Sequence, residues 1–289
     1  MTGRRDDEVT GLALYDRTAE DAAAAVIAAY STSFGLASRM LGPRVRSHVR
    51  NIYALVRVAD EIVDGPARSA GLDAETERRV LDDLETETLD AIDRGFSANL
   101  VVHAFARTAR ECGIGGDLVR PFFTSMRTDL TTAQHDGASH DAYVYGSAEV
   151  VGLMCLQAFV NAGEGAPRQP EPRLVDGARR LGAAFQDVNF LRDADHDAGA
   201  LGRDYLGAST REEVLARIDA DLDAAAEVIP LLPADCRRAV TAAHDLFAAL
   251  AVRLHGEPEP EARVRVPNPV KALVAARAWL GFSPRSARA

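Results

Sequence analysis

Lysine is nearly absent from this chain of 289 residues, because Lys271 is the only lysine among its 33 basic side chains. A phosphate group bound by any of the first 270 positions would therefore have to meet Arg or His. Arginine suits a diphosphate, since its planar guanidinium can donate two hydrogen bonds at once. A basic surplus is also missing: 43 acidic residues give a net charge of -10, which argues against nucleic acid as a partner.

Cysteine is scarce as well, with three residues. Cys112, Cys155 and Cys236 are odd in number, widely spaced and free of any C-x-x-C pair, which excludes a disulfide framework and a zinc site. No apolar run reaches the ~20 residues that span a bilayer, and the first residues show no signal-peptide pattern. We therefore expect a cytoplasmic protein, with contact at a membrane surface as the alternative.

Strand-like alternation and hairpin turns are missing too, whereas the good helix formers Ala, Leu, Arg and Glu are abundant. The sequence predicts a single all-α domain over residues 18–282, with a flexible segment at 1–17 and a disordered tail at 283–289. Helices are expected at about residues 18–40, 43–65, 73–94, 98–112, 116–131, 140–162, 171–198, 209–228, 233–254 and 268–281.

Paired carboxylates on one expected helix are the first candidate chemical groups. Asp60 and Asp64 stand four residues apart, so they share a helix face at a rise of about 6 Å. Arg57 and Tyr53 extend the same face toward the start of the helix. A lone D-x-x-x-D pair is common on solvated helix faces, so this pair alone would be weak evidence for a site.

A second helix repeats the arrangement. Asn189, Asp193 and Asp197 recur every four residues, Gln186 precedes Asn189 by three, and Arg192 adjoins. Magnesium prefers oxygen ligands and usually shares them between carboxylates and substrate phosphates. Two such helices facing each other could hold Mg²⁺ against a diphosphate and promote its departure. The combination of carboxylates with Asn, Gln and Arg amid apolar residues favours a site over a solvated face.

At these residues the chain resembles the squalene/phytoene synthase family of head-to-head prenyl diphosphate synthases. Five blocks carry the resemblance and fall in family order. They are S-F-x-L-A-S-R at 33–39, Y-A-L-x-R-x-A-D-x-x-x-D at 53–64, Y-V-Y-G-S-A at 143–148 with Val151-Gly152, Q-x-x-N-x-x-R-D-x-x-x-D at 186–197, and R-V-R-V-P-N-P-V-K at 263–271. The resemblance implies an isoprenoid-synthase-type helical bundle around a central cavity.

The resemblance also implies a role for each matched position. Tyr53 and Tyr143 would stand near the reacting carbons, and the four aspartates would bind Mg²⁺, or Mn²⁺ in its place. The four metal-binding positions are Asp60, Asp64, Asp193 and Asp197. The substrate-binding positions are Tyr30, Ser31, Ser33, Phe34, Arg57, Gln186, Asn189, Arg192 and Arg263. The stretch from Ala148 to Met154 would line the channel for the prenyl tail.

Several positions depart from the family pattern, among them an extra residue between Asp197 and Gly202 and Phe247 where many relatives have a tyrosine. Glu61 stands where Asp is usual, His196 where Glu is usual, and Glu149 where a glycine is usual. Glu149 would add a carboxylate to the substrate channel or face away from it. None of these changes removes one of the four aspartates, so they bear on the identity of the product more than on activity.

The expected reaction is the head-to-head condensation of two geranylgeranyl diphosphates to 15-cis-phytoene through a cyclopropyl diphosphate, an early step of carotenoid biosynthesis that needs no NADPH. The alternative within the family is a synthase that makes squalene or dehydrosqualene from farnesyl diphosphate. A rival from another class is a non-catalytic assembly factor of the same fold, although such relatives typically lose metal-binding aspartates. Oligomeric state is left open.

The remaining isolated residues have ordinary interpretations. His103, His135 and His140 are expected at the surface, and Trp279 in V-A-A-R-A-W-L-G-F is expected to pack in the core. The alternative for the Trp279 helix is contact with a membrane surface, because the substrates and product implied by the resemblance are lipids.

Overall fold

The computed structural model describes residues 10–31, 33–132, 137–196, 205, 209–256 and 264–285. Within these ranges the chain forms helices and no strand, which confirms the all-α prediction. The helices are α1 (Gly11–Tyr30), α2 (Ser33–Arg39), α3 (Pro43–Val63), α4 (Pro66–Ser69), α5 (Ala74–Arg94), α6 (Leu100–Cys112), α7 (Gly116–Thr131), α8 (Gly137–Val144), the π-helix η1 (Tyr145–Glu149), α9 (Val150–Asn161), α10 (Pro172–His196), α11 (Arg211–Val228), the short 3₁₀ turn η3 (Ile229–Leu231), α12 (Ala234–Gly256) and α13 (Asn268–Trp279). The proposed limits of the domain remain predictions, because residues 1–9 and 286–289 lie outside the described ranges.

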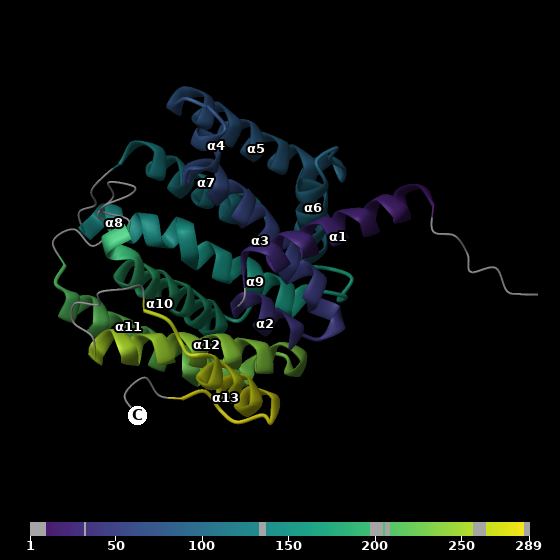
Figure 1. Ribbon diagram of the computed structural model, residues 1–289. Helices are drawn as coiled ribbons and strands as arrows, with labels where there is room; N and C mark the ends of the chain where they lie inside the picture. The colour runs from purple at the N-terminus through teal and green to yellow at the C-terminus, as the bar shows by residue number, and fades with distance from the viewer. Residues whose placement is uncertain are drawn as a thin grey trace, which may run out of the picture.

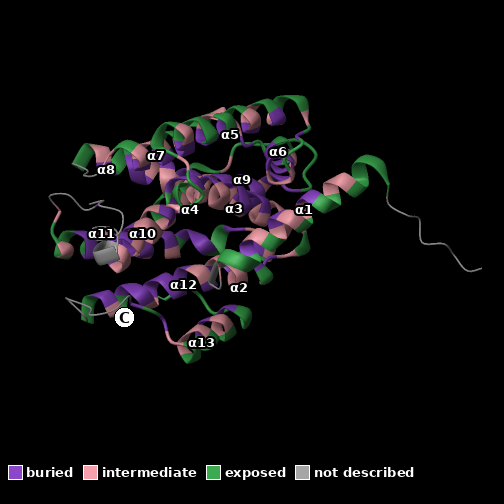
Figure 2. Ribbon diagram, turned by 45° about the horizontal axis from the view of Figure 1, so that its top comes forward, coloured by how far each residue is buried: buried purple, intermediate pink, exposed green. Residues whose placement is uncertain are grey.

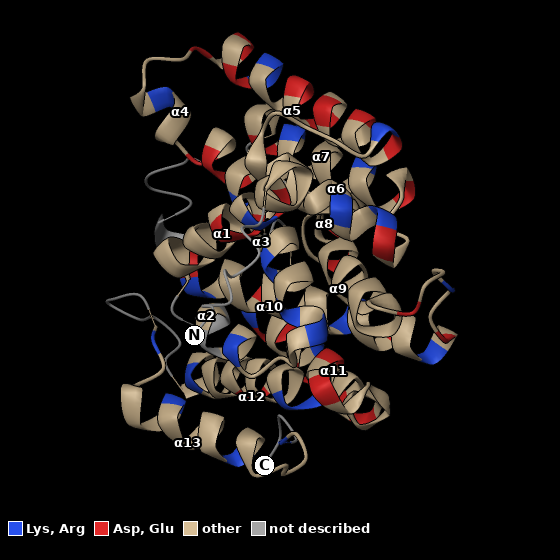
Figure 3. Ribbon diagram, turned by 90° about the vertical axis from the view of Figure 1, so that its right-hand side faces the viewer, with Lys and Arg blue, Asp and Glu red and all other residues tan. Residues whose placement is uncertain are grey.

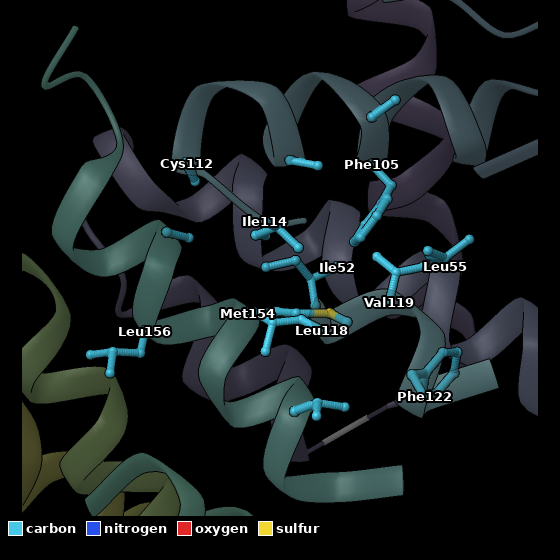
Figure 4. Close-up of a cluster of buried hydrophobic side chains, with 14 of the residues drawn as sticks. Ile52, Leu55, Phe105, Cys112, Ile114, Leu118, Val119, Phe122, Met154 and Leu156 are labelled. Carbon is cyan, nitrogen blue, oxygen red and sulfur yellow. The ribbon is translucent and has the colours of Figure 1, made fainter. Parts of the chain in front are cut away.

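The helices are arranged with α5 at one end of the molecule and α13 at the other (Figure 1). Between them α3, α7, α9 and α10 form the centre, and each of these helices contributes buried residues (Figure 2). Two hydrophobic cores result. One joins α3, α5, α6, α7 and α9, and includes Ile52, Phe105 and Phe122 (Figure 4). The other joins α10, α11, α12 and α13, and includes Leu191 and Phe247.

One predicted helix, residues 18–40, proves to be two. The helix α1 begins at Gly11, earlier than predicted, and ends at Tyr30, where Ser31 takes an extended backbone with φ -135° and ψ 116°. A run of hydroxyl side chains follows at 31–33, and such side chains compete with helical hydrogen bonds. Because the helix ends here, Ser31 lines a cavity instead of lying on a helix face.

A second departure lies in the stretch predicted as one helix at 140–162. The chain is helical from Gly137 to Asn161, but Tyr145–Glu149 forms a π-turn, a feature frequent at functional sites. A Cβ on Gly146 would lie 2.3 Å from the Pro121 carbonyl oxygen, so only glycine allows this close approach to α7. By length and mean hydropathy the stretch Gly137–Asn161 could also cross a bilayer. Half of its most apolar 18-residue segment is buried inside the protein, as in the core helix of a globular fold.

Candidate active site

A large cavity with a volume of about 1580 Å³ lies between the two cores. Residues of both cores line it, among them Ile52 of the first and Leu250 of the second. The volume exceeds the range of about 300–1,000 Å³ that is usual for a site holding one small ligand. The cavity is therefore large enough for a bulky ligand or for two ligands at once.

The cavity has an apolar end and a polar end. Along α10 its lining changes from Leu174, near the start of the helix, to Asn189 and Asp193 near the end. At 1.5 Å per residue, Leu174 and Asp193 are about 28 Å apart along the helix axis. The lining of α3 changes in the same way, from Val49 to Asp60. An elongated ligand with a charged head and an apolar tail matches this division.

The α3 side of the polar end carries Asp60 and Asp64. Asp60 is half-buried on the cavity wall, and Asp64 is the exposed residue that caps α3. Burial, together with the negative charge of Asp64, raises the pKa of Asp60 well above its ordinary value. Arg57 pairs with Glu61, and its guanidinium lies 4.6 Å from the centre of the Tyr30 ring. The carboxylate at position 61 is thus engaged by a neighbouring arginine.

Tyr53 stands one helical turn before Arg57 on the same wall. Burial raises the pKa of the Tyr53 phenol, whereas the charge of Arg57 and a hydrogen bond with the Ser31 side chain lower it, and the net direction is upward. The break after α1 is what brings Ser31 to this phenol. Tyr53 is therefore a protonated phenol that faces the cavity between its apolar and acidic ends.

The α10 side of the polar end carries the second motif. Gln186, Asn189, Arg192 and Asp193 all line the cavity. Arg192 donates two hydrogen bonds to the carboxylate of Asp193, at 3.0 and 2.5 Å. This bidentate pair holds the carboxylate in one orientation and keeps a guanidinium at the polar end.

A fourth carboxylate, which the sequence motifs did not reveal, completes this end of the cavity. Asp129 of α7 is buried and accepts hydrogen bonds from the hydroxyls of Tyr143 and Tyr205, each at 2.8 Å. Burial and the charge of Asp129 raise the pKa of Tyr143 well above its ordinary value, so this phenol stays protonated. The Tyr205 ring stacks on Phe190, with ring centres 4.5 Å apart. The only sequence signal for Asp129 was an acid between apolar residues of an amphipathic helix, close to Met126.

Most of the predicted site residues lie on this one cavity, while their catalytic and binding roles stay predictions. The lining includes Tyr30, Ser31, Tyr53, Arg57, Asp60, Asp64, Tyr143, Gln186, Asn189, Arg192 and Asp193. Asp197 and Arg263 lie outside the described residues, as do the side chains of Ser33, Phe34 and His196.

The wall predicted from Ala148 to Met154 is only partly correct. Ala148, Val151 and Gly152 line the cavity, but Met154 is buried in the first core and points into that core (Figure 4). Glu149 is not among the residues that line the cavity. Its carboxylate accepts a hydrogen bond of 2.6 Å from Arg179 instead. The open question about Glu149 is therefore answered in favour of a face turned away from the channel.

The polar end suits a divalent cation shared with a ligand. Asp60, Asp64 and Asp193 line the same cavity as the amide of Asn189, and carboxylate and amide oxygens are the ligands that Mg²⁺ prefers. The pKa of Asp60 is raised first by burial and then by the negative charge of Asp64, and the opposing effect of Arg57 does not cancel these two. In the part of the chain that the structure describes, no group of three or more His, Cys, Asp or Glu side chains could hold a metal ion alone. Oxygen atoms of a bound diphosphate would complete the coordination.

An all-helical fold with a deep, partly apolar cavity and carboxylates at one end defines the class of isoprenoid synthases. The chain belongs to the squalene/phytoene synthase family, whose model, described as Squalene/phytoene synthase, matches residues 27–212. The family's reaction is head-to-head prenyl condensation; its substrates are prenyl diphosphates, and it uses Mg²⁺.

Several known proteins are similar to this chain. A 15-cis-phytoene synthase of Paracoccus sp. is 27% identical over 255 residues, covering 79% of this chain and 80% of that protein. A 15-cis-phytoene synthase of Synechocystis sp. is 32% identical over 186 residues, covering 63% of this chain and 53% of that protein. A crystal structure of a dehydrosqualene synthase in complex with ligand matches with a TM-score of 0.76 at 22% identity, covering 92% of this chain and 97% of that one, which supports the fold.

Proposed function

We propose that this protein is a 15-cis-phytoene synthase that joins two geranylgeranyl diphosphates head to head. The observation that carries the proposal is the cavity of about 1580 Å³, whose lining carries carboxylates and arginines at one end and is mostly apolar toward the start of α10. The phytoene synthases of Paracoccus and Synechocystis, similar to this chain over most or much of its length, support the longer substrate.

The polar end would bind the diphosphates. Arg57 and Arg192 supply guanidinium groups that can pair with phosphate oxygens, and the Ser31 hydroxyl can donate to them. Asp60, Asp64 and Asp193 would hold Mg²⁺ there, with Asn189 beside them. When bound, Mg²⁺ neutralises the charge of the departing diphosphate and so favours ionisation of the allylic C–O bond.

The middle of the cavity would protect the reacting carbons. Tyr53 and Tyr143 both line it as protonated phenols, and aromatic faces stabilise nearby positive charge. Asp129 fixes the hydroxyl of Tyr143 through its 2.8 Å hydrogen bond. Because Tyr143 stays protonated, it would orient and shield a carbocation but would not itself remove a proton.

Two condensation stages would follow from this arrangement. One geranylgeranyl diphosphate loses its diphosphate, and the allylic cation alkylates the C2–C3 double bond of the second with loss of a proton, giving a cyclopropylcarbinyl diphosphate. Loss of the second diphosphate, rearrangement and loss of another proton give a C40 hydrocarbon with a conjugated triene at its centre. The apolar lining excludes water, which would otherwise capture the cation. No reductant enters this sequence.

Two other functions fit less well. A squalene or dehydrosqualene synthase would use the shorter farnesyl chain in the same cavity, and the structural match to a dehydrosqualene synthase keeps it as the runner-up. A non-catalytic assembly factor would have no use for Asp60, Asp64 and Asp193 on the wall of one cavity.

Product identification tests the proposal. We expect purified protein with Mg²⁺ to convert geranylgeranyl diphosphate to a C40 hydrocarbon without NADPH, at least about tenfold more efficiently than it converts farnesyl diphosphate, because each buried methylene favours the longer chain. Gas chromatography with mass detection identifies the product. A preference for farnesyl diphosphate and a C30 product would contradict the phytoene assignment and leave the family assignment intact. No hydrocarbon from either substrate would favour the non-catalytic alternative.

A further inference from the structure

The helix α13 is apolar on the face that it turns to solvent. Its exposed positions recur at helical spacing and end at two large side chains, Trp279 and Leu280, each 64% exposed. The exposed residues of this face are Asn268, Pro269, Ala272, Leu273, Ala276, Trp279 and Leu280, and all but Asn268 are apolar. Its inner face is apolar too, because Val274 is buried in the second core and Ala278 is also buried. Apart from Asn268, Lys271 and Arg277, α13 is thus apolar on both its inner and its outer face, and an exposed apolar surface of this kind marks an interaction site.

The turn after α13 extends this surface. Phe282 is 53% exposed, and the guanidinium of Arg277 lies 5.1 Å from the centre of its ring. The backbone N–H of Arg285 donates to the buried carboxylate of Asp245 at 2.9 Å, which ties the segment to α12. The apolar surface is thus held in place by a defined anchor.

The charge of this segment is opposite to that of the rest of the protein. Residues 264–285 contain four basic residues and no acidic one, in a chain of net charge -10. The four are Arg265, Lys271, Arg277 and Arg285. Figure 3 shows α13 in tan and blue without red, whereas α5, at the opposite end of the molecule, carries both signs. We call this segment, residues 264–285, the basic apolar surface.

We propose that the basic apolar surface docks on a lipid bilayer that contains anionic headgroups. Trp279, Leu280 and Leu273 would enter the boundary between headgroups and acyl chains, and the basic side chains would meet lipid phosphates. The charge pattern selects this occupant over a second copy bound through the same face, because such a pair would bring the four basic side chains of each copy together, whereas lipid phosphates would neutralise them.

The position of the cavity supports the same occupant. Val264, Arg265, Val266 and Lys271, at the start of the basic apolar surface, also line the cavity. Docking would therefore place the cavity wall next to the acyl chains of the membrane. A water-insoluble hydrocarbon could pass between the two without crossing bulk water, which goes beyond the reaction proposed above.

The single tryptophan of the chain offers a direct test without substrate. Trp279 is the only tryptophan, so protein emission reports on this surface alone. We expect vesicles of equal parts phosphatidylcholine and phosphatidylglycerol to shift the emission to the blue, and phosphatidylcholine vesicles to have little effect. High salt should weaken the binding, because it screens the attraction between the basic side chains and the headgroups. Since no turnover is measured, failure of the proposed reaction would not affect this result.

Matched variants locate the contact. Leu273→Asp adds a charge to the exposed face of α13, and Val80→Asp adds the same charge to an exposed position of α5. We expect Leu273→Asp to weaken vesicle binding at least about tenfold, measured by co-sedimentation, and Val80→Asp to leave it unchanged. Equal losses in the two variants, or no blue shift with anionic vesicles, would overturn the proposal. A blue shift that depends on protein concentration without lipid would overturn it in favour of a second copy.

Discussion

Asp60→Asn is expected to lower turnover by about 10³-fold while making the metal-free protein more stable, not less. The Asp60 carboxylate is partly buried on the cavity wall and lies near the charge of Asp64, so its pKa in the folded protein is well above its ordinary value. A raised carboxyl pKa means that the folded state binds the proton more tightly than the unfolded state does. Proton binding at Asp60 therefore adds to the free energy of unfolding. This contribution is fully present at a pH below the ordinary Asp pKa and is lost as the pH rises through the raised pKa of Asp60.

Asparagine keeps the shape of the side chain and removes the free-energy cost of a partly buried negative charge beside Asp64. At neutral pH in the presence of a chelator, the melting temperature of Asp60→Asn should therefore exceed that of the wild type, and the difference should shrink as the solution is acidified. The matched control is Asp90→Asn, an exposed acid of α5, for which activity and melting temperature should both stay near the wild-type values. Retained turnover in Asp60→Asn would contradict the metal-binding role, and a lower melting temperature would contradict the electrostatic account.

Tyr143→Phe is expected to lower kcat by about 10²-fold with little change in KM, because without its hydrogen bond to Asp129 the ring is no longer held in place against the developing carbocation. Asp129 acts through Tyr143 by accepting its hydroxyl hydrogen bond at 2.8 Å, so it is a positioning residue. Asp129→Asn should lower kcat as well. The double variant should be no slower than Tyr143→Phe alone, since the second change removes an interaction that is already absent.

The control for this pair is Tyr205→Phe. It removes the other hydrogen bond to Asp129, also 2.8 Å, while leaving that of Tyr143 in place. We expect a smaller loss of kcat and a loss of stability of about 0.5–1.5 kcal/mol. If the losses from Asp129→Asn and Tyr143→Phe simply multiplied, the two residues would act independently, and the positioning role of Asp129 would be wrong.

The helices and the two carboxylate motifs could be predicted from the sequence because both depend on short-range periodicity. Asp60 and Asp64, or Asn189 and Asp193, lie on one helix face whatever the rest of the chain does. Their convergence on one cavity was predicted only through the family resemblance. The helix spacing alone does not say which faces of α3 and α10 meet.

Features that depend on distant contacts could not be predicted. Asp129 is an isolated acid in the sequence and becomes part of the site only through Tyr143 and Tyr205, which come from other segments. The predicted surface positions of His103 and His140 were wrong, because both are buried: His103 lies 2.8 Å from Asp16, and His140 packs against Phe190. Polar residues give no sign of burial when their partners are far away in the chain.

Trp279 shows the opposite error. A large aromatic residue on an apolar helix predicts a core position, because burying it contributes favourably to folding. The structure leaves it 64% exposed, since α13 packs against α12 through small residues on its other face. Amphipathicity could not reveal this, because a helix that is apolar on both faces has no pattern that identifies the inner one.

Carboxylates and Mg²⁺ at the polar end of the cavity are proposed to hold a prenyl diphosphate. The most direct test of this binding is calorimetric titration with an unreactive thiolodiphosphate analogue of the substrate. We predict that Mg²⁺ strengthens binding of the analogue to the wild type by at least about tenfold, because phosphate and carboxylate oxygens share the cation. In Asp60→Asn and Asp193→Asn this gain should disappear, while the weak metal-free binding persists. An affinity that is the same with and without Mg²⁺, or a gain that survives in both variants, would contradict the account.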